Sequence, residues 1–243
     1  MKAGRTRYLL LGDIKADSLR RLYGTLGIDA LFEVQSRFDE LIATNVGAAC
    51  RITAPGGTDI AFRLDKKPGG MKTRRVDRPG TSTVMGSCVF YPEPDSMRGV
   101  IALDAVFHEY YAVLRTPIRL EIDGEIRKID HVREHEIPME RALRRASNGG
   151  YGRVIHLTCG FHPAARFSGR SFIEDIRSIG ANAIGLGSRG GSSAVARIIR
   201  TASCCAKISG SAARRSSKNG RIVGPDPLAR VARDITELDA MVA

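Results

Sequence analysis

Two histidines bracket a short turn that follows a predicted buried strand. His156 lies in the strand segment 154–157 and His162 lies just beyond it, within IHLTCGFHPAAR. Glu174 and Asp175 follow within FSGRSFIEDIR. The ends of strands are a usual place for functional sites, and two imidazoles with one carboxylate suit zinc, iron or manganese. We therefore predict that His156, His162 and Glu174 bind one divalent metal ion, with Asp175 as a further ligand or a catalytic base.

A purely structural role is the alternative for both histidines. His156 would then be a hydrogen-bonded strand residue, and His162 would only begin a loop, because a lone histidine on an apolar face often serves packing. The residue types and their spacing leave both interpretations open.

A second polar group lies at His108, Glu109, Tyr110 and Tyr111. His108 and Tyr110 share a face if the preceding strand continues through them, because side chains alternate along a strand. Either could serve as a general base or as a hydrogen-bond donor that orients a substrate. We predict His108 and Tyr110 as catalytic residues. The alternative is a strand edge that packs its aromatic side chains.

Other motifs carry less weight. The i,i+4 pair His131 and His135 could bind zinc on a helix, but Pro138 follows closely, so we expect a solvated loop there. The Gly-rich stretch GLGSRGG lacks the strand–GxGxxG–helix context of a nucleotide site. The sequence contains no GxSxG motif, which disfavours a serine hydrolase.

Hydrophobic periodicity predicts the elements that would position these residues. Apolar residues at helical spacing, with Asp29 as a cap and Gly47 after the end, indicate an amphipathic helix over 29–45. Alternation and apolar runs indicate strands, and Asp123-Gly124 marks a hairpin turn. The predicted strands are 8–11, 51–53, 60–64, 99–106, 118–122, 126–129 and 154–157, and the other predicted helices are 139–146 and 226–242.

The positive charge of the chain is concentrated near its C-terminal end. The formal net charge is +12, and no Asp or Glu occurs from 176 to 225. Such a segment attracts polyanions, although a solvated basic face is the simpler interpretation. No aromatic residue follows Phe172, so stacking on nucleic-acid bases is not available there. Weak polyanion binding by 176–225 is therefore an expectation.

The cysteines and the lack of a hydrophobic leader point to the cytoplasm. There are five cysteines, an odd number, and no CxxC pair, so neither a disulfide framework nor a zinc ribbon is indicated. The N-terminal apolar run, 8–11, is too short for a signal peptide, and no stretch is long enough for a membrane helix. We expect a cytoplasmic protein that does not bind a membrane.

Four segments resemble the aminopeptidase T family. RITAPGGTDIAFRL resembles its "RITSPxGTDLTF", and DRPGTSTVMGSCVFYPEPDSMRGVIALD resembles its PGGE segment with the strand that follows. CGFHPAARFSGRSFIEDIRSIGANAIGLG resembles "GIGxNPxAxxxGxxxEDEKxxGTVHIGLG", and NGRIVGP resembles a terminal "DGRIVG". The match runs in order from about 47 to 224, with the same spacing up to Gly187. The same superfamily includes the iron-dependent ring-opening enzyme 2,5-dihydroxypyridine dioxygenase.

The resemblance implies a metal site that this sequence does not fully reproduce. The family's Glu in PGGE corresponds to Thr81 or Ser82, and the Glu that opens "ELGIG" corresponds to His156. The last two residues of EDEK correspond to Ile176 and Arg177. The His of "TVHIGLG" corresponds to Ala183. A final His-x-Asp pair is expected around 193–198, where the sequence has neither residue. These departures exclude a two-metal site, and one ion at most (Zn, Fe, Mn or Co) is expected.

The composition changes abruptly after Gly187. From 188 to 219, Ser, Ala, Arg and Gly dominate, and only Ile198 and Ile199 resemble core residues. A structureless insert of this length is uncommon within a compact domain. A shifted reading frame would account for it.

We expect an α/β protein of α+β character, with a mixed, β-rich sheet domain and flanking helices. Residues 1–46 would be an N-terminal remnant or linker, and 47–243 the aminopeptidase T-like domain with an irregular basic segment at 188–219. The leading hypothesis is a metal-dependent, aminopeptidase-like hydrolase of a peptide or a small polar substrate. The alternatives are a single-iron ring-cleaving oxygenase and a non-catalytic relative that binds a partner through its basic segment. Association into a homodimer is left open.

Overall fold

A computed structural model describes most of the chain up to residue 187 and short strands beyond it. The described residues are 6–24, 28–66, 79–107, 110–130, 136–146, 150–187, 195–200, 207–209, 217–218 and 221–222. Outside these residues lie His108, His131, His135 and the predicted helix 226–242.

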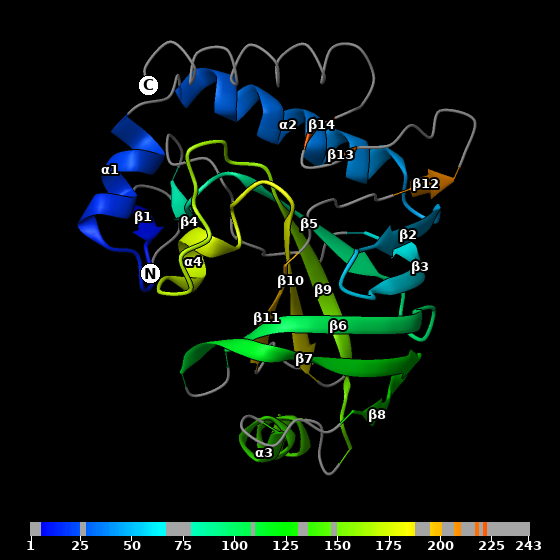
Figure 1. Ribbon diagram of the computed structural model, residues 1–243. Coiled ribbons are helices and arrows are strands. Elements are labelled where there is room, and N and C mark those ends of the chain that lie inside the picture. The colour runs from blue at the N-terminus through cyan, green and yellow to red at the C-terminus, as the bar shows by residue number, and fades with distance from the viewer. Residues whose placement is uncertain are drawn as a thin grey trace.

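A 10-stranded sheet forms the body of the molecule (Figure 1), in the order β12-β2-β3-β5-β9-β10-β11-β6-β7-β8. All of its pairings are antiparallel. The bounds are β2 Ala49–Thr53, β3 Asp59–Asp65, β5 Ser87–Pro92, β6 Arg98–Phe107, β7 Tyr111–Asp123, β8 Glu125–Ile129, β9 Arg153–Gly160, β10 Ala181–Gly187, β11 Val195–Arg200 and β12 Lys207–Ser209.

The sheet curls and closes on itself through β3. The end of β3 at Leu64 pairs with Pro92 of β5, whereas its beginning at Ile60 pairs with Gly99 of β6. Because β5 continues through β9, β10 and β11 to β6, these strands and β3 form a closed ring. Closing a sheet in this way leaves no unpaired edge within the ring.

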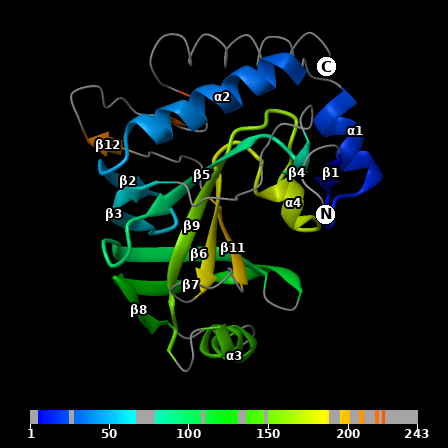
Figure 2. The same cartoon turned by 180° about the vertical axis from the view of Figure 1, so that it is seen from behind.

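Helix α2 (Ile28–Thr44) covers one end of the curled sheet, and α3 (Glu136–Ala146) lies at the opposite end, as the two views in Figures 1 and 2 agree. The buried face of α2 contributes Leu31, Val34 and Phe38 to the same core as the inward residues of the strands. The ring of Phe38 stacks on Phe161 with centroids 4.9 Å apart. The hydrophobic periodicity of α2 is thus explained by its packing on the sheet.

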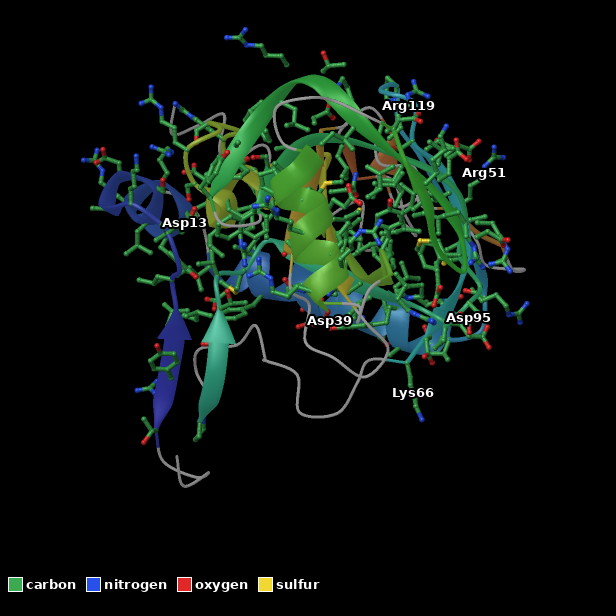
Figure 3. The ribbon with its side chains drawn as sticks, turned by 90° about the horizontal axis from the view of Figure 1, so that it is seen from below. Asp13, Asp39, Arg51, Lys66, Asp95 and Arg119 are labelled. Carbon is green, nitrogen blue, oxygen red and sulfur yellow. The ribbon has the colours of Figure 1, made fainter. Side chains whose placement is uncertain are left out.

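The N-terminal segment forms a small unit beside the large sheet. Strand β1 (Arg7–Leu10) pairs in parallel with β4 (Gly80–Thr83), and Figure 3 shows the two strands side by side. Helix α1 (Ala16–Gly24) follows β1 and buries Leu22 against Val84 and Ala165. The segment therefore packs on the chain beyond residue 79. The proposed division at residue 46 stays a prediction.

The predicted fold class is confirmed, and so are the helices and strands predicted within the described residues. The segment 188–219 differs from the expectation of an irregular stretch, because its described residues include strands β11 and β12 of the large sheet. Helix α2 and strands β1, β2, β3, β6, β8 and β9 correspond to predicted segments within a few residues. The predicted hairpin turn carries Gly124 at φ +69°, a left-handed conformation that glycine adopts without strain. No described helix is long and apolar enough to cross a membrane.

Candidate functional site

A short helix carries the two predicted carboxylates. Helix α4 (Phe172–Asp175) is capped by Ser171, whose hydroxyl accepts a hydrogen bond from the Glu174 N–H. Asp13, from the turn after β1, accepts further hydrogen bonds from the N–H groups of Phe172 (2.6 Å) and Ile173 (3.0 Å). Figure 3 places Asp13 between the N-terminal helix and this segment. These acceptors satisfy N–H groups that have no partner inside so short a helix.

The carboxylate of Asp175 is completely buried and receives several hydrogen bonds. Its Oδ1 accepts from the N–H (2.8 Å) and the hydroxyl (3.1 Å) of Ser168. Its Oδ2 accepts from the hydroxyl of Tyr111 and the N–H of Gly169, both at 2.7 Å. Because each oxygen already has two donors, Asp175 holds the loop before α4 and the start of β7 in place.

Glu174 fastens α4 to helix α1. Both of its oxygens accept from Nη2 of Arg21, at 2.8 and 2.9 Å, and Oε1 also accepts from the Arg166 N–H at 3.2 Å. Burial by itself raises the pKa of Glu174, but hydrogen bonds from Ser18, Arg21 and the Arg166 N–H outweigh it, so the pKa lies below its ordinary value. The side chain is therefore a buried carboxylate that is charged near neutral pH.

His162 has both ring nitrogens engaged with the backbone. Nε2 lies 3.0 Å from the Leu22 carbonyl oxygen, which can only accept, and Nδ1 lies 3.2 Å from the Ala164 nitrogen, which can only donate. The ring is therefore the neutral Nε2–H tautomer. Burial, with a smaller effect of the charge on Arg177, lowers its pKa to about 4, although the bond to Leu22 opposes this.

A close approach of the backbone at Gly86 makes room for the His162 ring. A Cβ at Gly86 would lie 2.4 Å from the Cβ of His162, and Gly86 has φ +95°. A larger residue at this position would displace the histidine and strain the backbone.

His156 lies within β9, whereas His162 lies after the end of this strand. His156 is directly opposite Gly185 of β10, and its ring covers that glycine, since a Cβ there would lie 2.2 Å from Cε1 of His156. The ring of Tyr91 is 6.3 Å away, centroid to centroid. The four steps along the strand from His156 to Gly160 span roughly 13 Å, which separates His156 from the turn that contains His162.

The structure does not gather the predicted ligands into one metal site. Among the described residues, no group of three or more His, Cys, Asp and Glu side chains could hold a metal ion. His162 has no free nitrogen lone pair, and the oxygens of Glu174 and Asp175 already accept hydrogen bonds. In this arrangement the described side chains do not direct three lone pairs at a common point, as a zinc or iron site requires. The metal-binding roles of His156, His162 and Glu174 stay predictions.

Of the predicted catalytic residues, Asp175 and Tyr110 can be placed. Tyr110 is 51% exposed next to the start of β7, whereas its neighbour Tyr111 reaches Asp175. Tyr111 also packs edge-on against Phe107 and Phe172. His108 lies outside the described residues. The catalytic roles of His108, Tyr110 and Asp175 stay predictions.

Several residues that organise this region were not predicted. Asp13 and Arg21 come from the N-terminal segment, and Arg177, only 2% exposed, donates to the carbonyls of Val84 and Ile173. One signal was available in the sequence, because Ser171 followed three residues later by Glu174 is a helix-capping pattern. The long-range partners of Glu174 and Asp175 had no such local signal.

Comparisons with solved structures identify this architecture. A 2,5-dihydroxypyridine dioxygenase from Pseudomonas putida KT2440 superposes with a TM-score of 0.58 at 17% identity, covering 91% of this chain and 73% of that one. AmpT from Thermus thermophilus gives a TM-score of 0.57 at 14% identity, covering 85% of this chain and 57% of that one. Identities this low establish a common fold, and the chain spans just over half the length of AmpT.

The sequence comparisons are more specific. No curated protein matches the chain significantly. A family model does match, over residues 2–186, and its description is 2,5-dihydroxypyridine 5,6-dioxygenase. This supports the predicted superfamily but not the aminopeptidase T family within it. Because the match covers most of the chain and ends where the composition changes, we conclude that the chain belongs to the NicX family of 2,5-dihydroxypyridine 5,6-dioxygenases.

Proposed function

We propose that this chain is a non-catalytic member of the family, in which the predicted metal-site side chains fasten the N-terminal segment to the sheet. The observation that carries the proposal is the engagement of Glu174, Asp175 and His162 by hydrogen-bond donors and acceptors of the protein itself. Coordination of a metal ion by His162 would displace the Ala164 N–H from Nδ1, and buried groups left without partners are costly.

The same side chains have a clear structural role. Glu174 binds Arg21, His162 binds the Leu22 carbonyl, and Asp13 caps α4. The three contacts join the segment of β1 and α1 to the region around α4. These contacts link parts of the chain that are far apart in sequence, 153 residues in the case of Arg21 and Glu174. Their loss would weaken an attachment to which the β1–β4 pairing and the packing of Leu22 also contribute.

Ring-cleaving oxygenase activity is the second candidate, favoured by the description of the matching family. It would require a metal ion with donors other than those that the described residues offer. The aminopeptidase-like hydrolase has weaker support, since it rests on the predicted resemblance and on similarity of fold to AmpT.

Elemental analysis of the purified full-length chain tests the proposal. The chain is incubated with ferrous, manganous or zinc ions and desalted. Oxygen uptake with 2,5-dihydroxypyridine and release of an amine from an amino-acid amide are then measured. We expect less than a tenth of a metal ion per chain and neither activity. Stoichiometric metal that is lost in both His156→Ala and His162→Ala would overturn the proposal, and oxygen uptake dependent on that metal would establish the oxygenase.

The partner that we propose for this chain follows only from the charge of its segment 176–225. The segment 176–225 has no acidic residue and many basic ones, so we propose weak, salt-sensitive binding of a polyanion. Replacement of Arg214, Arg215 and Lys218 by alanine should weaken binding of duplex DNA and reduce its dependence on salt. Equal binding by the variant, or binding unaffected by salt, would contradict it.

A further inference from the structure

Two cysteines face each other across neighbouring strands. Cys88 of β5 is directly opposite Cys159 of β9, and Cys159 is in turn directly opposite Asn182 of β10. Directly opposed residues of antiparallel strands project from the same face of a sheet. Cys88 is 1% exposed within the core, and Cys159 is half-buried against that core. Both thiols are reduced in the structure.

Their placement is compatible with a covalent bond between the two sulfur atoms. Directly opposed Cα atoms in an antiparallel pair are about 4.5–5.5 Å apart, and disulfides form over Cα separations of about 4.4–6.8 Å. The Cβ atoms of such pairs, at about 4.5–5.5 Å, would have to approach by about 1 Å to reach the usual disulfide spacing. A cross-link is therefore within reach, with some strain in the strands.

In the reduced form the two sulfur atoms contact other groups. The Cys88 thiol points at the carbonyl oxygen of Cys159, 3.7 Å away. The Cys159 thiol donates to Oδ1 of Asn182 at 2.6 Å, so it is turned toward β10. A bond to Cys88 therefore requires the Cys159 sulfur to turn away from Asn182.

We propose that Cys88 and Cys159 form an oxidation-sensitive pair that closes a cross-strand disulfide in the presence of a peroxide. The partly exposed Cys159 thiol reacts first: hydrogen peroxide transfers one oxygen to its sulfur, giving a sulfenic acid and one water. The sulfur of Cys88 then attacks the sulfur of Cys159, the S–O bond breaks, and a second water leaves with the proton of Cys88. Overall two thiols lose two hydrogens, and one peroxide becomes two waters.

The cross-link would fix β9 to β5 within the closed ring. Cys159 lies three residues after His156 on β9, so oxidation would constrain the strand that carries this predicted ligand. A disulfide strained in this way is more easily reduced than an unstrained one. The pair would therefore respond reversibly to the redox state, independently of whether the chain binds metal.

Peptide mapping of the full chain tests the proposal. The chain is treated with hydrogen peroxide, free thiols are blocked, and tryptic peptides are analysed by mass spectrometry without reduction. We expect one cross-linked species joining peptide 76–98, which contains Cys88, to peptide 154–166, which contains Cys159, and its loss on treatment with dithiothreitol. Blocked thiols at both positions, or disulfides only elsewhere in the chain, would overturn the proposal.

A matched variant separates this pair from general oxidation. Cys50 is also buried, at 2% exposed, but it faces Phe62 on β3 and Ile208 on β12 rather than a cysteine. Burial raises the pKa of Cys50 to about 11, so its thiolate is scarce. Cys50→Ser should leave the 88–159 cross-link unchanged, whereas Cys88→Ser should abolish it and allow sulfinic acid to accumulate at Cys159. A cross-link reduced equally in both variants would contradict a specific pair.

Discussion

The hydroxyl of Tyr111 donates a hydrogen bond to Oδ2 of Asp175 over 2.7 Å and so joins the start of β7 to helix α4. The acceptor is a buried carboxylate, and a hydrogen bond to a charged group contributes about 1.5–3 kcal/mol. Tyr111→Phe should therefore lower the free energy of unfolding by about 2 kcal/mol, measured by urea titration. Tyr110→Phe, at an exposed neighbouring position, is the control and should change it by less than about 0.5 kcal/mol. Equal effects of the two variants on the free energy of unfolding would show that the contact of Tyr111 with Asp175 does not stabilise the fold.

The Arg21–Glu174 pair should make stability sensitive to acid. Glu174 has a folded-state pKa below its ordinary value of 4.5, so its contribution is fully present above that value and is lost as the pH falls through the folded-state pKa. Glu174→Gln should lower the free energy of unfolding at pH 7 by about 1–3 kcal/mol. The difference from the native chain should shrink below pH 4.5. A difference that stays constant down to pH 3 would contradict the ion pair.

His162 should produce a separate pH dependence at higher pH. Its pKa falls from 6.5 to about 4 on folding, so the unfolded chain binds the proton more tightly. The contribution of the neutral His162 ring to stability is therefore fully present above pH 6.5 and decreases as the pH falls toward 4. The difference between the two values, at about 1.4 kcal/mol for each unit of pKa, corresponds to about 3 kcal/mol.

Thermal or urea unfolding between pH 4 and 7 measures this effect. The native chain should lose stability steadily on acidification from pH 6.5, and His162→Gln should lose much less over the same interval. Parallel curves for the two proteins would mean that His162 is protonated equally readily in the folded and unfolded states.

The segment after Gly187 leads to a prediction about the gene. In one displaced reading frame, each codon consists of the third base of one codon and the first two bases of the next. This frame can encode His across Ile198–Ile199 and Asp across Arg200–Thr201. It can also encode Gly across Thr201–Ala202. This reproduces the His-x-Asp pair that the resemblance leads one to expect in this region. The family match also ends at 186.

Resequencing the gene and translating all frames between codons 188 and 219 tests this prediction. We expect Asp and Glu codons to reappear in the displaced frame and the pattern to return to the printed frame at NGRIVG. Stop codons throughout both alternative frames would rule out a shifted frame. In that case the basic composition would not derive from a shift of frame. The polyanion binding proposed above and the position of strand β11 both refer to the chain in its present sequence.

Local patterns sufficed to predict much of the fold. Leu31, Val34 and Phe38 recur at helical spacing because one face of α2 packs on the sheet, and Asp123-Gly124 marks the β7–β8 turn because glycine tolerates the required φ. Strand β10 was missed, since all of its residues are buried and a short apolar run has no distinguishing period.

The candidate site was harder to predict for a different reason. The residue types of His162, Glu174 and Asp175 suit a metal, but their actual partners come from elsewhere in the chain. Leu22, Arg21 and Tyr111 supply those partners, and no spacing in the sequence indicates that they are adjacent. Residue type therefore restricted the chemistry that was available, whereas tertiary contacts determined how each group is used.

The closure of the sheet through β3 affects how the chain is synthesised. Strand β3 is made early, but the ring is completed only when β11 (Val195–Arg200) takes its place between β10 and β6. Until the ribosome has released that strand, β10 is paired only with β9, and residues 105–107 of β6 are paired only with β7. Both strands then offer an open edge to other chains. A nascent chain stalled before residue 195 should therefore aggregate or require a chaperone, whereas one released after residue 200 can close its barrel.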